Sequence, residues 1–182
     1  MTKLLCIIPL LAITFFAMSD DQFLYNFTSA SAKAWEVEDD TVMGGISEGH
    51  FGVNDAGHGH FHGHVSLEND GGFSSIQREF EPRLDVSGDR AFTLRVKGDG
   101  KKYALRVQKT ADQEYMHQGS FQTSGDWEVV RVPFDSMSAM HHGEAVDVPN
   151  FSGGMVQKLQ LMIGNNKEQD FELLIDWIGS EE

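Results

Sequence analysis

Apolar and polar residues alternate with a period of two in five short segments of the sequence. In "AFTLRVKGDG" (91–100), Phe92, Leu94 and Val96 are separated by polar residues. Successive side chains of a strand point to opposite faces, so this pattern predicts strands with one buried face. The residues expected on buried faces are Phe92, Leu94, Val96, Tyr103, Leu105, Val107, Val130, Val132, Phe134, Leu159, Leu161, Ile163, Phe171, Leu173, Ile175 and Trp177.

Glycine-rich turns separate these segments, and no long stretch shows the 3.6-residue period of a helix. Turn sequences such as "NDAG", "SGD", "GDG" and "GNN" recur at short spacing. Short alternating strands between regular turns are typical of antiparallel sandwiches. We therefore expect an all-β, single-domain antiparallel jelly-roll β-sandwich over residues 20–182, with one long irregular segment at about 135–154.

The composition limits the possible partners. The chain has 182 residues and a formal charge of −14 at pH 7, with no concentrated basic segment. Binding to a nucleic acid backbone depends on clustered Lys and Arg, so nucleic acid is not expected as a partner. Thirteen Phe and three Trp argue against a disordered chain.

The first 19 residues, "MTKLLCIIPLLAITFFAMS", have the pattern of a secretory signal peptide. One Lys precedes an apolar run that ends at a small-x-small site, and the run is shorter than the ~20 residues of a membrane span. We therefore expect a periplasmic or secreted protein whose mature form has no transmembrane segment and lacks Cys6, the only cysteine. The alternative is a cytoplasmic protein whose translation starts at Met18.

A histidine-rich segment, "GISEGHFGVNDAGHGHFHGHVSLE", predicts a hairpin. A three-residue loop at 55–57, with Gly57 in the left-handed conformation, places Phe51 opposite Phe61 on the buried face. His50 then lies opposite His62 on the other face. The residues expected on this outer face are Glu48, His50, His60, His62 and His64.

Two interpretations of the histidines stand. Imidazoles at alternate positions of a strand can chelate zinc or nickel, which would make this face a metal site, weak or adventitious. The alternative is a polar strand exposed to solvent. We expect no required cofactor, and no sequence pattern pairs a nucleophile such as Ser74 or Ser75 with a base.

The glycine pairs do not form a phosphate-binding loop, because a strand rather than a helix follows Gly44-Gly45. Five blocks resemble the complex I intermediate-associated protein 30 domain family over residues 35–178. They are "DDTVMGGIS" (39–47), "FHGHVSLENDGGFSSI" (61–76), "LRVKGDGKKYALRV" (94–107), "GDWEVVRVPF" (125–134) and "FELLIDWI" (171–178). The resemblance implies a galactose-binding-domain-like jelly roll and a non-catalytic role, since mitochondrial members assist assembly of NADH:ubiquinone oxidoreductase. The histidines are not part of the family pattern.

The recognisable blocks supply candidate binding residues in two loops. Either the loops form a common rim where a peptide or sugar docks, or their glycines serve only as turns. The candidates are Asp40, Thr41, Met43, Gly44, Gly45, Gly72, Phe73, Ser74 and Ser75.

Two arginines are further candidates, because each lies mid-strand between apolar residues and points away from the core. We expect adjacent strands to align Arg95 and Arg106, for binding a ligand carboxylate or for pairing with local acids. The local acids considered are Asp39, Asp40 and Glu79. Parity places Trp177 in the core and makes Trp127 a candidate for a surface position.

Three hypotheses follow. The first is a non-enzymatic binding or assembly module with a protein partner. The second is a carbohydrate-binding module, from fold analogy alone. The third is a metal-binding protein or metalloenzyme that uses the histidine-rich strand.

Overall fold

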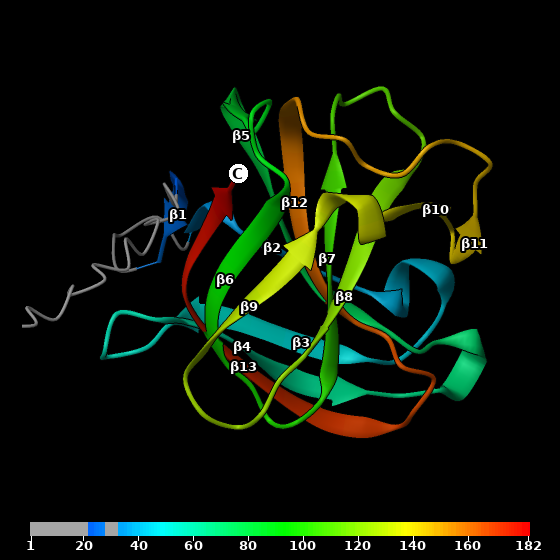
Figure 1. Cartoon of the computed structure of the whole chain (residues 1–182). Coiled ribbons are helices and arrows are strands. Elements are labelled where there is room, and N and C mark those ends of the chain that lie inside the picture. The colour runs from blue at the N-terminus through cyan, green and yellow to red at the C-terminus, as the bar shows by residue number, and fades with distance from the viewer. Residues whose placement is uncertain (1–21, 28–32) are drawn as a thin grey trace, which may run out of the picture.

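The computed structural model describes residues 22–27 and 33–182. The predicted leader, residues 1–19, lies outside this part of the chain. The described residues form two antiparallel sheets, which confirms the all-β jelly-roll sandwich expected from the sequence (Figure 1). Within these residues, no helix is long and apolar enough to cross a membrane.

One sheet has six strands, in the order β3-β4-β13-β6-β9, with β1 also paired to β13. All its pairs are antiparallel. The strands are β1 (Gln22–Asn26), β3 (Glu48–Val53), β4 (Gly59–Val65), β6 (Ala91–Lys97), β9 (Glu128–Pro133) and β13 (Gln169–Glu181).

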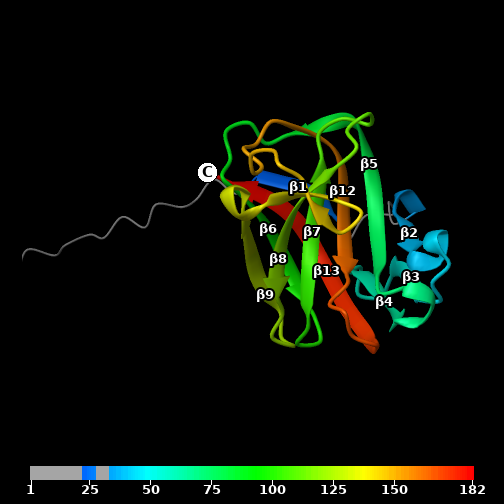
Figure 2. The ribbon, with the colours of Figure 1, turned by 90° about the vertical axis from the view of Figure 1, so that its right-hand side faces the viewer.

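The other sheet has seven strands, in the order β11-β10-β8-β7-β12-β5-β2. Figure 2 shows β2 and β3, from different sheets, at the same side of the molecule. The strands are β2 (Glu36–Asp39), β5 (Ser74–Asp85), β7 (Lys102–Gln108), β8 (Met116–Gln122), β10 (Ser138–His141), β11 (Glu144–Ala145) and β12 (Met155–Ile163). Short 3-10 helices are η2 (Asp40–Met43), η3 (Glu68–Asp70) and η4 (Phe134–Ser136).

The core lies between the two sheets and is filled by the alternate residues of the predicted strands. Leu94 and Leu173 of the six-stranded sheet and Leu105 and Leu161 of the seven-stranded sheet are all fully buried. Removing such apolar surface from water is the main favourable term in folding. The alternation therefore predicts the buried face of each strand, with one exception.

The exception is Trp177, for which the prediction of a core position is wrong. The register of β13 against β6 shifts between Ile175 and Trp177, which marks a β-bulge. The extra residue reverses the parity of the strand, so Ile178 takes the buried position instead. Trp177 is half-buried and packs edge-on against Phe23, with ring centroids 5.3 Å apart.

The segment 135–154, expected to be irregular, contains η4, β10 and β11. β10 pairs with β8 and β11 pairs with β10, so they extend the edge of the seven-stranded sheet. Strands of four and two residues are too short to show alternation, and for this reason the sequence pattern did not reveal them.

The predicted register of the β3–β4 hairpin is confirmed. Phe51 lies opposite Phe61, and His50 lies opposite His62. Gly57 has a φ of 84°, the left-handed conformation expected for the loop. The parity of both strands is therefore fixed by this local turn.

Gly63 allows the close approach of β3 and β4. A Cβ atom at this position would lie 2.1 Å from the Glu48 backbone oxygen, whereas a Cβ at Gly52 would meet nothing within 4 Å. We expect Gly63→Ala to lower the free energy of unfolding by about 2 kcal/mol or more, because backbone must move. Gly52→Ala, in the same hairpin, should change it by less than about 0.5 kcal/mol. Urea denaturation of both variants tests this, and equal effects would contradict the steric explanation.

Candidate functional site

The side chain of Asp40 joins the two glycine-rich loops. Asp40 begins η2, directly after β2, and its side chain is buried. Its Oδ1 atom accepts a hydrogen bond from the Ser47 backbone N–H (2.9 Å). Its Oδ2 atom accepts bonds from the Ser47 hydroxyl (2.5 Å) and from the backbone N–H groups of Gly72 (2.6 Å) and Phe73 (3.2 Å). One carboxylate therefore fixes loop 40–47 against loop 66–73.

Two glycines make room for this carboxylate. A Cβ atom at Gly45 would lie 2.3 Å from Asp40 Oδ1, and one at Gly71 would lie 2.7 Å from Oδ2. Gly44 has a φ of 96°, at the C-terminal end of η2. Turn geometry at Gly44, and close approach to the Asp40 carboxylate at Gly45 and Gly71, therefore explain why glycine occupies these positions.

The structure buries the side chains of three candidate binding residues, Asp40, Ser74 and Ser75, and a fourth candidate, Gly45, is buried as well. The Ser75 hydroxyl donates to the Glu38 backbone oxygen at 2.8 Å. Direct contact with a partner is therefore closed to these three side chains. Asp40 and Ser75 hold the loops and β5 in place through their hydrogen bonds, whereas the buried Ser74 hydroxyl has no hydrogen-bond partner among the described residues.

Exposed apolar side chains surround the joined loops. Val42, Met43 and Ile46 are 69%, 64% and 51% exposed, and Leu67 of the second loop is 43% exposed. Leu67 approaches Gly72, since a Cβ on Gly72 would lie 3.4 Å from Leu67 Cδ2. We call these four residues the apolar rim. The sequence reasoning selected Met43 but missed the other three, although apolar residues in a non-alternating segment were a visible signal.

The polar partners of Asp40 determine its protonation. Burial alone raises the pKa of its carboxyl, but the hydrogen bonds from Ser47, Gly72 and Phe73 outweigh burial and lower the pKa below its ordinary value. A carboxyl whose pKa is lower in the folded state stabilises the fold above its unfolded pKa of about 3.9. This stabilisation is lost as the pH falls through the folded pKa.

We expect Asp40→Asn to lower the free energy of unfolding by about 2–4 kcal/mol. The amide nitrogen of Asn is a donor, so it cannot accept hydrogen bonds from the N–H groups that face it. Asp55→Asn, at an exposed loop position, is the control and should leave stability nearly unchanged. Chemical denaturation at pH 7 measures both. A loss below about 0.5 kcal/mol for Asp40→Asn would show that the carboxylate does not join the loops.

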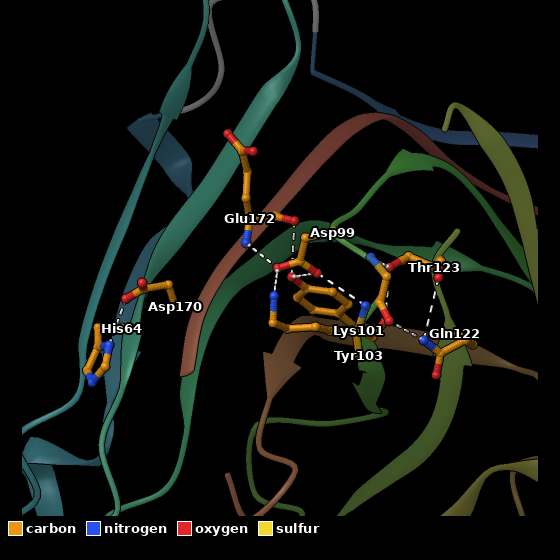
Figure 3. Close-up of polar contacts among 9 residues, drawn as sticks. His64, Asp99, Lys101, Tyr103, Gln122, Thr123, Asp170 and Glu172 are labelled. Atoms are coloured by element: carbon orange, nitrogen blue, oxygen red, sulfur yellow. Dashed lines mark hydrogen bonds and ion pairs between the residues drawn. The ribbon is translucent and has the colours of Figure 1, made fainter. Parts of the chain in front are cut away.

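The histidines lie on the outer face of the six-stranded sheet, as expected. The ring centroid of His62 is 4.3 Å from that of His60 and 5.3 Å from that of His50. His64 Nδ1 lies 2.8 Å from Asp170 Oδ1 (Figure 3), and His60 Nε2 lies 2.9 Å from Glu172 Oε1. Two imidazoles of β4 thus lie beside carboxylates of the neighbouring strand β13.

The five predicted metal ligands share a face, but three of the histidines pair with three different carboxylates. His50 Nε2 lies 3.3 Å from Glu48 Oε1, while His60 and His64 contact β13. Among residues 22–27 and 33–182, no group of three or more His, Cys, Asp or Glu is arranged to hold a metal ion. The sequence reasoning missed Asp170 and Glu172, because only the pairing of β4 with β13 brings them beside the histidines. Zinc or nickel binding stays a prediction.

Burial lowers the pKa of His62, and the neighbouring His60 and His50 lower it further, while Glu172 acts in the opposite direction. A histidine whose pKa is lower when folded takes up protons more readily in the unfolded chain. His62 therefore reduces the stability of the fold as the pH falls through the pKa of an unfolded histidine, about 6.5. Buried His117, whose pKa burial also lowers, acts in the same direction.

We accordingly expect His62→Gln to lose less stability than the wild type between pH 7 and pH 5. His142→Gln, at an exposed position, is the control and should follow the wild type. Urea denaturation at both pH values measures the difference. An unchanged pH dependence in His62→Gln would mean that the imidazole cluster does not perturb this residue.

The two candidate arginines lie in different sheets, so the expectation that adjacent strands align them is wrong. Arg95 of β6 forms an ion pair with Asp176, and its guanidinium carbon lies 4.7 Å from the Trp127 ring centroid. Arg106 of β7 donates to Gln160 Oε1 at 2.7 Å. The partners considered from sequence are not the ones found: neither bonds Asp39, Asp40 or Glu79, and Glu79 instead pairs with Lys158 at 3.2 Å.

The outer face of the seven-stranded sheet carries a row of polar side chains. Strand register places Gln118, Arg106, Gln160, Gln77 and Glu36 side by side across five strands. Two hollows, of about 530 Å³ and about 310 Å³, open on this face. Among the described residues that line them, the only aromatic is Tyr103, which is buried.

Two antiparallel sheets, two loops joined by the Asp40 carboxylate and two polar outer faces define a jelly-roll module. The chain belongs to the Complex I intermediate-associated protein 30 (CIA30) family, whose model matches residues 25–175. This confirms the resemblance in the sequence blocks. No curated protein matches the sequence.

Solved structures with the same fold include carbohydrate-binding modules. The family 11 module from Clostridium thermocellum, in complex with a β-1,3-1,4-mixed-linked tetrasaccharide, has a TM-score of 0.62 and 13% identity, covering 91% of this chain and 96% of that chain. The family 11 module of the cellulosomal cellulase Lic26A-Cel5E of Clostridium thermocellum has a TM-score of 0.64 and 12% identity, covering 91% and 97%. The agarase AgWH50C has a TM-score of 0.57 and 14% identity, covering 89% of this chain but 25% of the agarase. At these identities the likeness shows the fold alone.

Proposed function

We propose that this protein is a non-catalytic binding module of the assembly-factor type, which docks a protein partner through the apolar rim. The observation that carries the proposal is the exposure of Val42, Met43, Ile46 and Leu67 on two loops held by one buried carboxylate. Exposed apolar side chains gathered at one place mark interaction sites, whereas singly scattered ones are common on any surface. Family membership supports a role in protein assembly.

The rim is also suited to docking because it is fixed before a partner arrives. The four hydrogen bonds to Asp40 restrain both loops. A surface that is already ordered loses less conformational entropy on binding, so more of the contact energy contributes to affinity. The leader pattern in residues 1–19 supports a periplasmic or secreted location for this interaction.

Site-specific photo-crosslinking in cells of the source organism tests the proposal. A photoreactive amino acid at Val42 or Met43 should crosslink one and the same protein. Val129 is the matched control, since it is 57% exposed and lies on β9, an edge strand of the six-stranded sheet. The double variant Val42→Ser/Met43→Ser should lose the partner and keep its unfolding midpoint. An identical crosslinking pattern from Val129, or no crosslinked protein from the rim, would refute docking there.

A second candidate function is carbohydrate binding on the outer face of the seven-stranded sheet. The partly exposed amides Gln77, Gln118 and Gln122 and the two hollows favour it, because amides donate and accept hydrogen bonds as sugar hydroxyls require. The family 11 module named above was solved with a bound tetrasaccharide, which adds analogy of fold. The missing exposed aromatic in the described lining makes this candidate the weaker of the two, since stacking on a sugar ring needs an exposed aromatic face.

A further inference from the structure

The larger hollow is built on the middle of the seven-stranded sheet. Its floor is formed by outward residues of β7, β8 and β12, and its walls by the segments 100–102 and 164–169. Its volume of about 530 Å³ lies within the range of ~300–1,000 Å³ typical of ligand pockets. The hollow is therefore large enough for a small ligand or a short stretch of a polymer.

One wall is held in place by the carboxylate of Asp99 (Figure 3). It accepts hydrogen bonds from Lys101 Nζ (2.7 Å), the Tyr103 hydroxyl (3.1 Å) and the Glu172 backbone N–H (2.8 Å). These bonds fix the loop before β7 to both sheets. The shape of the hollow thus does not depend on a ligand to form it.

The charge of the lining is opposite to the charge of the protein. Lys101, Lys102 and Lys167 line the hollow, and none of its described lining residues is acidic, in a chain with a formal charge of −14. Lys101 is paired with Asp99. Lys102 and Lys167 form no ion pair with any carboxylate of the described chain. Two ammonium groups are therefore available to an anionic ligand.

The remaining polar groups suit a sugar better than a nucleobase. The lining amides include Gln118, Gln122 and Asn165, which both donate and accept hydrogen bonds. Single-stranded nucleic acid sites rely on exposed aromatic rings for base stacking. The one aromatic residue in the described lining, Tyr103, is buried in the core and offers no such face.

We infer that this hollow binds an anionic sugar chain, whose carboxylate or sulfate groups contact Lys102 and Lys167 while its hydroxyls contact the amides. Arg106 of β7 lies beside the hollow, since its guanidinium donates a hydrogen bond to the sulfur of Met162, which lines it. This inference rests on the second candidate function, carbohydrate binding, and is independent of docking at the apolar rim.

Isothermal titration calorimetry with matched ligand pairs tests the inference. The probes are oligogalacturonate with its methyl ester, dextran sulfate with dextran, and a single-stranded thymidine oligonucleotide. We expect at least one charged sugar to bind about tenfold more tightly than its uncharged counterpart, and to weaken as NaCl rises from about 50 to about 500 mM, because salt screens exposed charges. The two pairs distinguish carboxylate from sulfate as the source of the negative charge.

Three results would overturn the inference. If charged and uncharged sugars bind equally, the result supports carbohydrate binding but refutes the preference for an anionic sugar. If none of the sugars binds, both the inference and the second candidate function, carbohydrate binding, are refuted. If the oligonucleotide binds as tightly as the charged sugar, the hollow recognises negative charge without recognising sugar.

Two variants locate the binding. Lys102→Gln/Lys167→Gln should weaken binding of the charged sugar about tenfold, because two exposed ion contacts are lost, and should leave the unfolding midpoint unchanged. The control is Lys97→Gln, which removes an exposed lysine of β6 from the other sheet. Equal weakening by both variants would place the binding outside the hollow and overturn the assignment.

Discussion

The alternation of apolar and polar side chains along the strands determines where this protein can act. Each strand gives one face to a shared core between the two sheets, and this core is closely filled by Phe, Leu, Ile and Val. A filled core leaves only the outer faces and the connecting loops for binding. Every candidate site described here accordingly lies on an outer face or on the rim.

The buried carboxylate of Asp40 joins loops that are about thirty residues apart in the sequence. A buried charge is tolerated only when hydrogen bonds satisfy it, and here four donors do so. Gly45 and Gly71 are needed because a side chain at either position would collide with that carboxylate. The same arrangement that explains these glycines also leaves the apolar rim facing solvent.

The two outer faces differ in their chemistry. The face of the six-stranded sheet combines imidazoles with carboxylates. The face of the seven-stranded sheet combines amides with lysines and an arginine, and its second hollow also carries Glu36 and Glu79. Local charge rather than net charge decides what each face attracts at short range, because salt screens more distant groups.

The sequence by itself determined the strand faces, the register of the β3–β4 hairpin and the family, because these depend on neighbouring residues and on one short turn. It also placed the histidines on one surface. Only the tertiary structure decided that Asp170 and Glu172 lie beside them, that Arg95 and Arg106 belong to different sheets, and that a bulge turns Trp177 outward. The physical reason is that pairing between strands more than 100 residues apart, and an extra residue within one strand, leave no mark in a local alternating pattern.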